Sequence, residues 1–356
     1  MTRPETALQH RFKGVTAVIF VCLALLIVRE PARAAEPQAA FTLIDALGNT
    51  VKVPSPARRI VVTNGDAAEI LCALGAGDRI VGVTDHIVES GADLLPRLKG
   101  RPVVGSSQTP SVERIIELQP DLVIAYEMWM SREAFEAKLN PVGIPVIRLY
   151  CYRLEHLESD IRVLGKIAGN EAKAEEYVQH FRKVLDDVEK RLAGLSKKTR
   201  VYAESYRDYS TVARKSGADT LLEAAGVDNI ALSQPVPFPS ITPEWVVDQN
   251  PEVILKASSS VWLKMGYGIT DVDAVRAFRE GLMNRPAWSR IDAVKQGRVF
   301  LLSNEIWTGP RAPVGILTIA KWCYPDRFQD IDPQTVHREW LLKWHGRELK
   351  GIYVYP

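Results

Sequence analysis

The sequence predicts an α/β protein of two lobes, each a parallel sheet covered by helices, with one long rigid helix joining them and a ligand cleft between them. Three observations lead to this prediction. The chain of 356 residues is too long for one ordinary hydrophobic core. From Arg58 onward, short apolar runs alternate with helical stretches, as in parallel sheets with crossover helices. A segment that starts at Glu113 recurs at Glu244, which indicates two similar lobes.

The N-terminal segment has the pattern of a signal peptide. Arg11 and Lys13 precede an apolar run over residues 15–28. This run is shorter than the ~20 residues that a membrane-spanning helix needs. Small residues at Ala32 and Ala34 suit cleavage after residue 34. We therefore expect a signal peptide over residues 1–34 and a periplasmic or otherwise extracytoplasmic protein. A membrane anchor that stays attached is the alternative.

The first lobe is expected over residues 41–169. It begins with a small hairpin over residues 41–53, whose turn is formed by Gly48 and Asn49. The strands that follow are expected at residues 60–63, 80–83, 102–104, 122–125 and 146–149. Asp66 and Glu69 have the spacing of a helix start, with a capping acid and a second acid three residues later. A helix over residues 154–168 closes the lobe.

One long helix is expected between the lobes. Residues 171–192 are rich in Ala, Glu, Lys, Arg and Leu, and Gly194 follows them. At 1.5 Å per residue this helix would be ~33 Å long. The α/β alternation restarts only after it, so residues 170–194 are interpreted as a rigid strut that permits a small hinge motion. An ordinary surface helix is the alternative.

The second lobe, expected over residues 195–356, repeats the alternation, so both lobes are predicted to be Rossmann-like. Strands are expected at residues 200–203, 210–213, 253–255 and 298–302, and helices at residues 219–226 and 316–322. The tail after Pro325 mixes both patterns.

The repeat has the same order in both copies. Each copy has a helix that opens on Glu, a Pro that ends it, an acid and then an apolar strand. The copies run from Glu113 through Pro120 and from Glu244 through Pro251. Ser111 and Thr242, two residues before each Glu, are expected to cap the helices.

Candidate ligand contacts follow from the expected strand ends, because ligands of parallel α/β sheets bind beyond the carboxyl ends of the strands. Aromatic rings and arginines recur there, and together they suit a bulky ligand that carries negative charge. The candidates are Asn64, His86, Tyr126, Trp129, Tyr150, Tyr152, Arg153, Tyr206, Arg207, Tyr209, Trp262, Trp307 and Arg311.

Catalytic motifs are missing from the sequence. It has no G-x-S-x-G elbow, no phosphate-binding P-loop and no H-E-x-x-H pair. A formal net charge of +2 argues against nucleic-acid binding. We therefore expect no enzyme, no catalytic residue, no cofactor and no protein-built metal site. Asp85, His86 and Glu204 remain the candidates for a bare-metal site or for acid–base catalysis.

The cysteines give weak information. Cys22 lies inside the apolar N-terminal run, and Cys72 lies on the apolar face of an expected helix. A disulfide between Cys151 and Cys323 stays open, because spacing alone cannot establish it.

Several of these segments resemble the substrate-binding proteins of type II ABC importers, the periplasmic receptors for ferric siderophores, haem and cobalamin. The resemblance rests on the helix from Asp66 to Gly75, on both copies of the repeat and on the strut, and it covers about residues 55–325. It implies a monomeric receptor that captures a metal chelate between its lobes. It also implies that Glu113 and Glu244 bind arginine pockets on a permease dimer.

Both the role of the two glutamates and the identity of the ligand leave alternatives open. An acid in the first turn of a helix is favourable by about 0.3–1 kcal/mol without any partner, which would account for Glu113 and Glu244 singly. The expected ligand is a ferric siderophore-type chelate, with cobalamin, haem, a molybdate-type oxyanion and a bare metal ion as alternatives. Haem would need an axial ligand, for which the candidates are Tyr126, Tyr150, Tyr206 and His86. The tail after Pro325 either wraps the first lobe or marks a subgroup.

Overall fold

A computed structural model of the chain describes residues 39–91, 93–259 and 262–356. The predicted signal peptide, its alternative as an anchor, and Cys22 therefore lie outside the described residues. Among the residues that are described, no helix is both long and apolar enough to cross a membrane.

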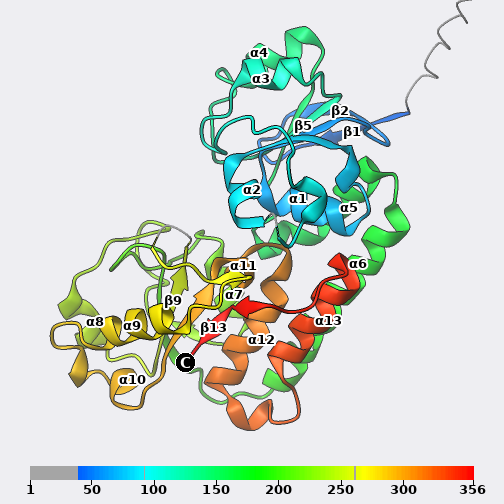
Figure 1. Cartoon of the computed structure of the whole chain (residues 1–356). Coiled ribbons are helices and arrows are strands. Elements are labelled where there is room, and N and C mark those ends of the chain that lie inside the picture. The colour runs from blue at the N-terminus through cyan, green and yellow to red at the C-terminus, as the bar shows by residue number, and fades with distance from the viewer. Residues whose placement is uncertain (1–38, 92, 260–261) are drawn as a thin grey trace, which may run out of the picture. The chain divides into compact units, whose positions relative to one another are not determined.

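The first lobe, coloured blue to green in Figure 1, is built on a parallel sheet with the strand order β4-β3-β5-β6. Its strands are β3 (Ile60–Val62), β4 (Ile80–Val83), β5 (Leu122–Tyr126) and β6 (Val146–Leu149). The expected hairpin is present as β1 (Ala40–Ile44) and β2 (Thr50–Pro54). The helices are α1 (Gly65–Ala73), α2 (Asp85–Gly91), α3 (Val112–Glu117), α4 (Glu136–Leu139) and α5 (Leu154–Ala168).

One expected strand of this lobe is wrong in extent. Residues 102–104 form only an isolated parallel bridge between Val83 and Val103. Pro102 has no N–H to extend a ladder, and Gly105 turns the chain away at a φ of +110°.

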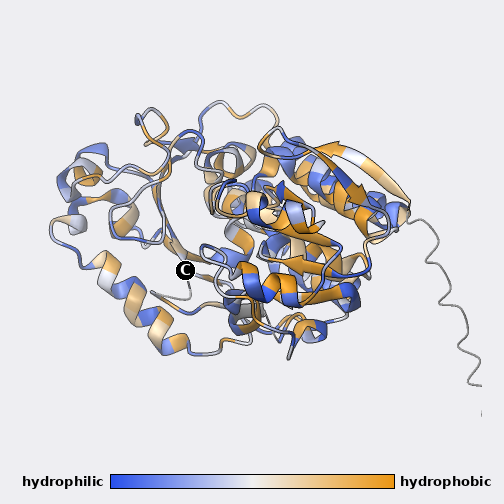
Figure 2. Ribbon diagram, turned by 90° about the horizontal axis from the view of Figure 1, so that it is seen from above, coloured by the Kyte–Doolittle hydropathy of each residue, from blue (hydrophilic) through white to orange (hydrophobic). Residues whose placement is uncertain are grey.

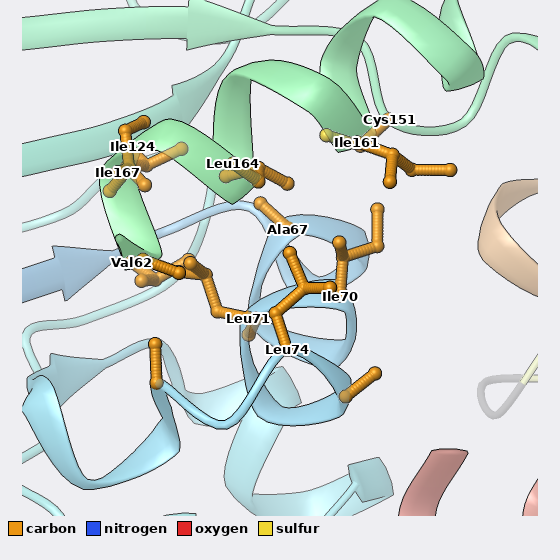
Figure 3. Packing of buried hydrophobic residues seen from close by; sticks show 14 of the residues in the cluster. Val62, Ala67, Ile70, Leu71, Leu74, Ile124, Cys151, Ile161, Leu164 and Ile167 are labelled. Carbon is orange, nitrogen blue, oxygen red and sulfur yellow. The ribbon is translucent and has the colours of Figure 1, made fainter. Parts of the chain in front are cut away.

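The core of the first lobe lies between its sheet, α1 and α5 (Figure 3). Ile70 and Leu71 from α1 meet Ile161 and Leu164 from α5, and all four side chains are fully buried. Ile70 and Leu71 follow Ala67 by three and four residues, and Leu164 follows Ile161 by three, so each set lies on one helix face. The residues that build α1 therefore also fix where its N-terminus stands at the end of β3.

The second lobe has a sheet in the order β13-β11-β9-β7-β8. Its strands are β7 (Arg200–Glu204), β8 (Asp228–Asn229), β9 (Val253–Ser258), β11 (Val299–Ser303) and β13 (Val354–Tyr355), of which β13 is antiparallel to β11. A separate pair joins β10 (Gly266–Tyr267) to β12 (Gly351–Ile352). The helices are α7 (Ala218–Ala224), α8 (Pro243–Gln249), α9 (Val272–Met283), α10 (Asp292–Lys295), α11 (Asn304–Trp307) and α12 (Ala312–Cys323).

The expected strand over residues 210–213 forms only isolated bridges, at Ser210 and Thr211. Positive φ angles at Tyr209 and Lys215 turn the chain on both sides of it, so it has no length for a ladder. The strands of the two sheets otherwise follow the expected alternation, and Figure 2 colours most of them as hydrophobic. The predicted α/β fold with parallel sheets is confirmed.

The repeat forms equivalent units in the two lobes. Ser111 accepts a hydrogen bond from the backbone of Arg114, and Thr242 accepts one from Trp245, so both predicted N-caps are confirmed. Each helix begins one residue before its Glu, at Val112 and at Pro243.

The ends of the two copies also match. The residue before each proline has a left-handed backbone, with φ 47° at Gln119 and 42° at Asn250. The acid after each proline then accepts a backbone hydrogen bond at the entry of a neighbouring strand. Asp121 binds the N–H of Arg59 at 2.9 Å, and Glu252 binds that of Arg200 at 2.8 Å. The second half of the repeat therefore joins strands within each lobe.

The long helix α6 (Glu171–Leu192) has the bounds that the sequence predicted. Tyr177 and Phe181 belong to the hydrophobic core of the first lobe, and Val188 and Leu192 belong to that of the second. One helix thus supplies side chains to both cores. The lobe limits at residues 169, 170–194 and 195 stay predictions, as do the stiffness of the helix and the cleft.

The tail after Pro325 contacts both lobes. Its helix α13 (Pro333–His345) runs beside α6 (Figure 1), and the ring of Trp340 stands at 90° to that of Tyr177, with 5.3 Å between ring centroids. Trp340 and Trp344 are buried in the first core, whereas β13 joins the second sheet.

The three cysteines among the described residues are separate thiols. Cys151 is buried in the first core and Cys323 in the second, so the disulfide that the sequence left open does not form. Cys72 is partly buried and packs against the first core, as expected from its place on the apolar face.

Candidate functional site

Four aromatic side chains meet at the carboxyl ends of β5 and β6. Tyr126 ends β5, Trp129 follows it, and Tyr150 and Tyr152 follow β6. The ring of Tyr126 lies 4.7 Å from that of Trp129 and 6.2 Å from that of Tyr152, and both contacts are edge-on. Tyr150 and Tyr152 are 6.5 Å apart. We call these four residues the aromatic cluster. The sequence predicted each of them as a candidate, and the structure brings them together.

Arg153 binds this cluster by its charge. Its guanidinium carbon lies 5.2 Å from the ring centroid of Tyr150 and 5.5 Å from that of Tyr152, which is cation–π geometry. Its Nε also donates to the Tyr152 hydroxyl at 3.0 Å, and that hydroxyl donates to Glu127 at 2.6 Å. Burial and the hydrogen bond to Glu127 raise the pKa of Tyr152. Glu127 therefore partly neutralises Arg153. The cluster is a polar aromatic surface without a free positive charge.

Asp66 connects the cluster to the second lobe. Its carboxylate accepts a hydrogen bond from Tyr126 at 2.8 Å. Burial raises the pKa of Asp66 to about 7, although the hydrogen bond from Tyr126 acts in the opposite direction. A Cβ on Gly309, in the short 3-10 helix η5 (Gly309–Arg311), would lie 2.4 Å from an Asp66 oxygen. Burial and the charge of Asp66 also raise the pKa of Tyr206.

The contact between α1 and η5 is closed by an ion pair. Arg311, 2% exposed, donates to Glu69 at 2.9 and 3.2 Å and lies 2.8 Å from Glu305. His345 of α13 lies 3.5 Å from the same Glu69. Burial alone would raise the pKa of Glu69, but Arg311 and His345 lower it to about 2. We call Asp66, Glu69, Gly309 and Arg311 the seam.

Three predicted ligand contacts are internal. Arg311 belongs to the seam, and Trp307, 2% exposed, belongs to the second core. Asn64 is fully buried, where it caps α1 through Ala67 at 3.0 Å and donates to the carbonyl of Leu149 at 3.0 Å. These contacts give all three side chains internal partners, and their role as ligand contacts stays a prediction.

The remaining candidates lie on the second lobe and on α2. Tyr206, partly buried, hydrogen-bonds Asn304, and Tyr209 stacks under Arg285 with 4.5 Å between the guanidinium carbon and the ring centroid. Arg207 and His86 are exposed, and Trp262 is 60% exposed. The structure thus gathers one tight aromatic group on the first lobe and scatters the other candidates.

Each lobe buries a cation that sequence reasoning missed. Arg148 in β6 is fully buried, and Lys256 in β9 is 1% exposed. Arg148 forms a two-point pair with Glu136, whereas Lys256 shares Glu204 with Arg285. A basic residue inside an otherwise apolar strand was the available signal, because such residues are almost never buried unless they are paired.

The structure does not assemble a metal site. In the described ranges, no group of three or more His, Cys, Asp and Glu side chains could hold a metal ion. Glu204 is 1% exposed and bound to Lys256 and Arg285, whereas Asp85 and His86 lie on α2 of the other lobe. The alternative set for a bare metal or for acid–base catalysis is therefore not brought together.

Among the described residues, the first lobe has a shallow hollow and a larger one. The shallow one, beside the aromatic cluster, is lined by Thr63, Ser107, Pro110, Ala125, Tyr126, Trp129, Met130 and Phe135. The larger one, of about 430 Å³, lies away from the cluster, between residues 49–52 and α4. Aromatic rings line the shallow hollow, which has no interior volume large enough for a water molecule.

Glu113 and Glu244 are exposed at the second position of α3 and of α8. The Ser111 hydroxyl donates to Glu113 at 3.1 Å. Hydrogen bonds from its own backbone N–H and from Ser111 lower the pKa of Glu113, so it is ionised at neutral pH.

Comparison with known proteins identifies the family. Residues 60–306 match the family model described as periplasmic binding protein. An uncharacterized ABC transporter substrate-binding lipoprotein, YvrC of Bacillus subtilis, is 28% identical over 297 residues, which are 81% of this chain and 87% of YvrC. A vitamin B12-binding protein of Vibrio cholerae is 27% identical over 255 residues, 70% of this chain and 90% of that protein.

A solved structure agrees on the fold. The TroA-like periplasmic binding protein FepB from Veillonella parvula superposes with a TM-score of 0.75, at 23% identity, over 88% of this chain and 99% of FepB. The resemblance drawn from the sequence is thereby confirmed. The chain belongs to the periplasmic binding protein family and is a substrate-binding protein of the kind that serves ABC importers.

Proposed function

We propose that this protein is an extracytoplasmic receptor that binds a bulky metal chelate, of the ferric siderophore type, and delivers it to an ABC importer permease. The aromatic cluster with Arg153 is the observation that carries the choice of ligand. Its rings offer flat apolar area, and hydroxyls of Tyr150 and Tyr152 lie among them. Such a surface suits an aromatic or macrocyclic chelate better than a small oxyanion, which needs converging N–H donors.

A corrinoid is the second candidate, because one relative is named as a vitamin B12-binding protein. The aromatic cluster would also serve a large macrocycle. The two candidates differ in charge at the ligand surface, and a binding test separates them.

The ligand is tested by binding to protein freed of bound molecules. The probes are a ferric tris-catecholate, a ferric tris-hydroxamate, cyanocobalamin, haemin and molybdate, measured by thermal shift and by quenching of tryptophan fluorescence. We expect a ferric chelate to raise the melting temperature, and we expect Trp129→Ala to weaken its binding by about tenfold or more. Trp322→Ala is the matched control, because Trp322 stacks on Phe300 at 4.3 Å, outside the cluster.

Other outcomes of this test discriminate between functions. Binding of cyanocobalamin alone would support the corrinoid candidate. Tight binding of molybdate, with Trp129→Ala unaffected, would overturn the role of the cluster. Chemical conversion of a probe would indicate an enzyme instead of a receptor.

We also propose that Glu113 and Glu244 contact the permease. They occupy equivalent places in the two copies of the repeat, both exposed, one on each lobe. A partner with two-fold symmetry would read two such acids together. The preference for an acid in the first turn of a helix explains either glutamate alone. It does not explain why both glutamates stand at the same place in the repeat.

Charge reversal tests this contact. Glu113→Lys with Glu244→Lys is expected to abolish uptake and to leave ligand affinity unchanged. The control reverses Glu117 and Asp248, exposed acids of the same two helices in the same register of the repeat. Lost ligand affinity in the first variant, or equal loss of uptake in the control, would contradict the assignment.

A further inference from the structure

A buried arginine holds the backbone of the segment that carries Tyr126 and Trp129. Arg148 of β6 is fully buried and divides its donors between two targets. Nε and Nη2 donate to the two oxygens of Glu136, at 2.7 and 2.9 Å. Nη1 donates to the carbonyl of Tyr126 at 3.0 Å and also to the carbonyl of Trp129. One guanidinium therefore links α4 to the start and to the end of the segment 126–129.

Tyr126 still pairs with Leu149 in the sheet, but residues 127–129 lie beyond the strand ladder. They follow β5 as a run of bends, and Met130 after them has a positive φ of 56°. Two carbonyls three residues apart point at one nitrogen, which fixes the curl of the chain between them. A lysine could not make all of these contacts, because Arg148 makes four donations and an ammonium group has only three N–H donors.

The second lobe has a corresponding arrangement. Nζ of Lys256 donates to Glu204 at 2.7 Å and to the carbonyl of Tyr206 at 3.2 Å, and it lies 3.5 Å from Asp208. Arg285 binds Glu204 at 2.8 and 3.0 Å and Asp208 at 2.6 Å. The turn that presents Tyr206 is thus held at its backbone by a buried cation from the neighbouring strand.

We infer that Arg148 and Lys256 are positioning residues, which set the backbone of the two aromatic segments before a ligand arrives. The inference rests on the proposed function, because it takes these segments as ligand-facing. Neither side chain touches the ligand. Stability alone does not explain them, since a buried ion pair can often be replaced by apolar residues without loss. A site held in its binding geometry beforehand loses less conformational freedom on binding.

The main test removes the first pair entirely, as Arg148→Met with Glu136→Leu. We expect the urea midpoint to stay near that of the wild type and amide hydrogen exchange over residues 127–131 to accelerate about tenfold or more. We also expect the ferric tris-catecholate to dissociate faster. Arg79→Met is the matched control, because Arg79 also donates to two backbone carbonyls, of Ala57 and Ala168, away from the cluster.

Two further variants test whether the effect is specific to Arg148 and to its segment. Arg148→Lys keeps a cation for Glu136 but has three donors for the four contacts that Arg148 makes, so protection over residues 127–131 should be intermediate. Lys256→Met should accelerate exchange over residues 205–209 and leave residues 127–131 protected. Unchanged exchange in both the double variant and Arg148→Lys would overturn the inference, and so would faster exchange with unchanged dissociation of the chelate. The exchange measurement needs no ligand. A wild type that binds no chelate would therefore overturn the proposed ligand, while the exchange data still decide the role of Arg148.

Discussion

The first lobe pairs its buried cation with a single carboxylate, whereas the second lobe shares one carboxylate between two cations. Arg148 has Glu136 alone, and the pair is sealed, with side-chain exposures of 0% and 5%. Glu204 binds Lys256 and Arg285 together, and the network reaches the surface at Asp208, which is 66% exposed. The scaffold of the lobes is repeated, but the charge beneath the aromatic segments is not. The loss of one buried cation should therefore affect the first lobe strongly. In the second lobe, the other cation can still pair with Glu204.

The largest loss of stability is expected when Arg148 is replaced, because no second cation pairs with Glu136 among the described residues. Arg148→Met leaves the buried Glu136 without a cation and should cost about 3–5 kcal/mol of unfolding free energy. Lys256→Met should cost clearly less, because Arg285 continues to hold both oxygens of Glu204. Urea unfolding at pH 7 measures both. Equal losses would show that the second network is not redundant.

The pH dependence sharpens the comparison at the seam, where two acids of one helix differ. The pKa of Asp66 is raised to about 7, so the folded protein binds this proton more tightly than the unfolded chain does. Stability from Asp66 is therefore present below a pH of about 4 and is lost as the pH rises to about 7. Because Asp66 is partly exposed, we expect at most on the order of 2 kcal/mol between pH 5 and pH 8.

Asp66→Asn should flatten this part of the profile. Thermal melting of both proteins from pH 5 to pH 8 measures it, and the wild type should lose more stability than the variant. Glu69 has a lowered pKa, so its contribution is lost only at acidic pH and leaves this window unchanged. A variant that follows the wild-type slope would contradict the prediction.

Gly309→Ala should weaken the contact between the lobes. The residue has a φ of +80°, and its new Cβ would meet the Asp66 carboxylate. The left-handed backbone alone costs about 1–2 kcal/mol in a non-glycine residue. Gly194→Ala is the control, with a φ of +71° and open space around it. We expect Gly309→Ala to lose about 1 kcal/mol more than the control in chemical unfolding. Equal losses would show that the seam accommodates a methyl group.

The smallest effect, and the most equal between the lobes, is expected for the repeat. Asp121→Asn and Glu252→Gln each weaken the carboxylate bonds to strand-entry N–H groups, at about 1 kcal/mol apiece. Similar shifts of the urea midpoint would show that the acid of the repeat contributes equally to stability in both lobes. A large difference would show that the lobes share only a pattern.

The main strands β3 to β7, β9 and β11, the caps and α6 could be predicted because their signals are local. Buried parallel strands are continuous apolar runs. Ser111 and Thr242 each cap the helix that follows them, through a backbone N–H three residues later. The seam could not be predicted, because Glu69 and Arg311 are joined only by the fold. Arg311 therefore looked like a free cation at a strand end. Each residue of the aromatic cluster could be predicted, because ligands bind beyond the strand ends. The backbone conformation that Arg148 holds between Tyr126 and Trp129 could not be predicted.

The placement of the tail also has a consequence for the order in which the protein folds. His345 completes the contacts of Glu69, and Tyr355 of β13 pairs with Leu301 of β11. Until those residues have emerged during synthesis, β11 presents an open edge to other chains. The first sheet is complete at Leu149, but its core still awaits Trp340 and Trp344. The lobes can therefore begin to form in sequence, whereas neither is finished before the tail arrives.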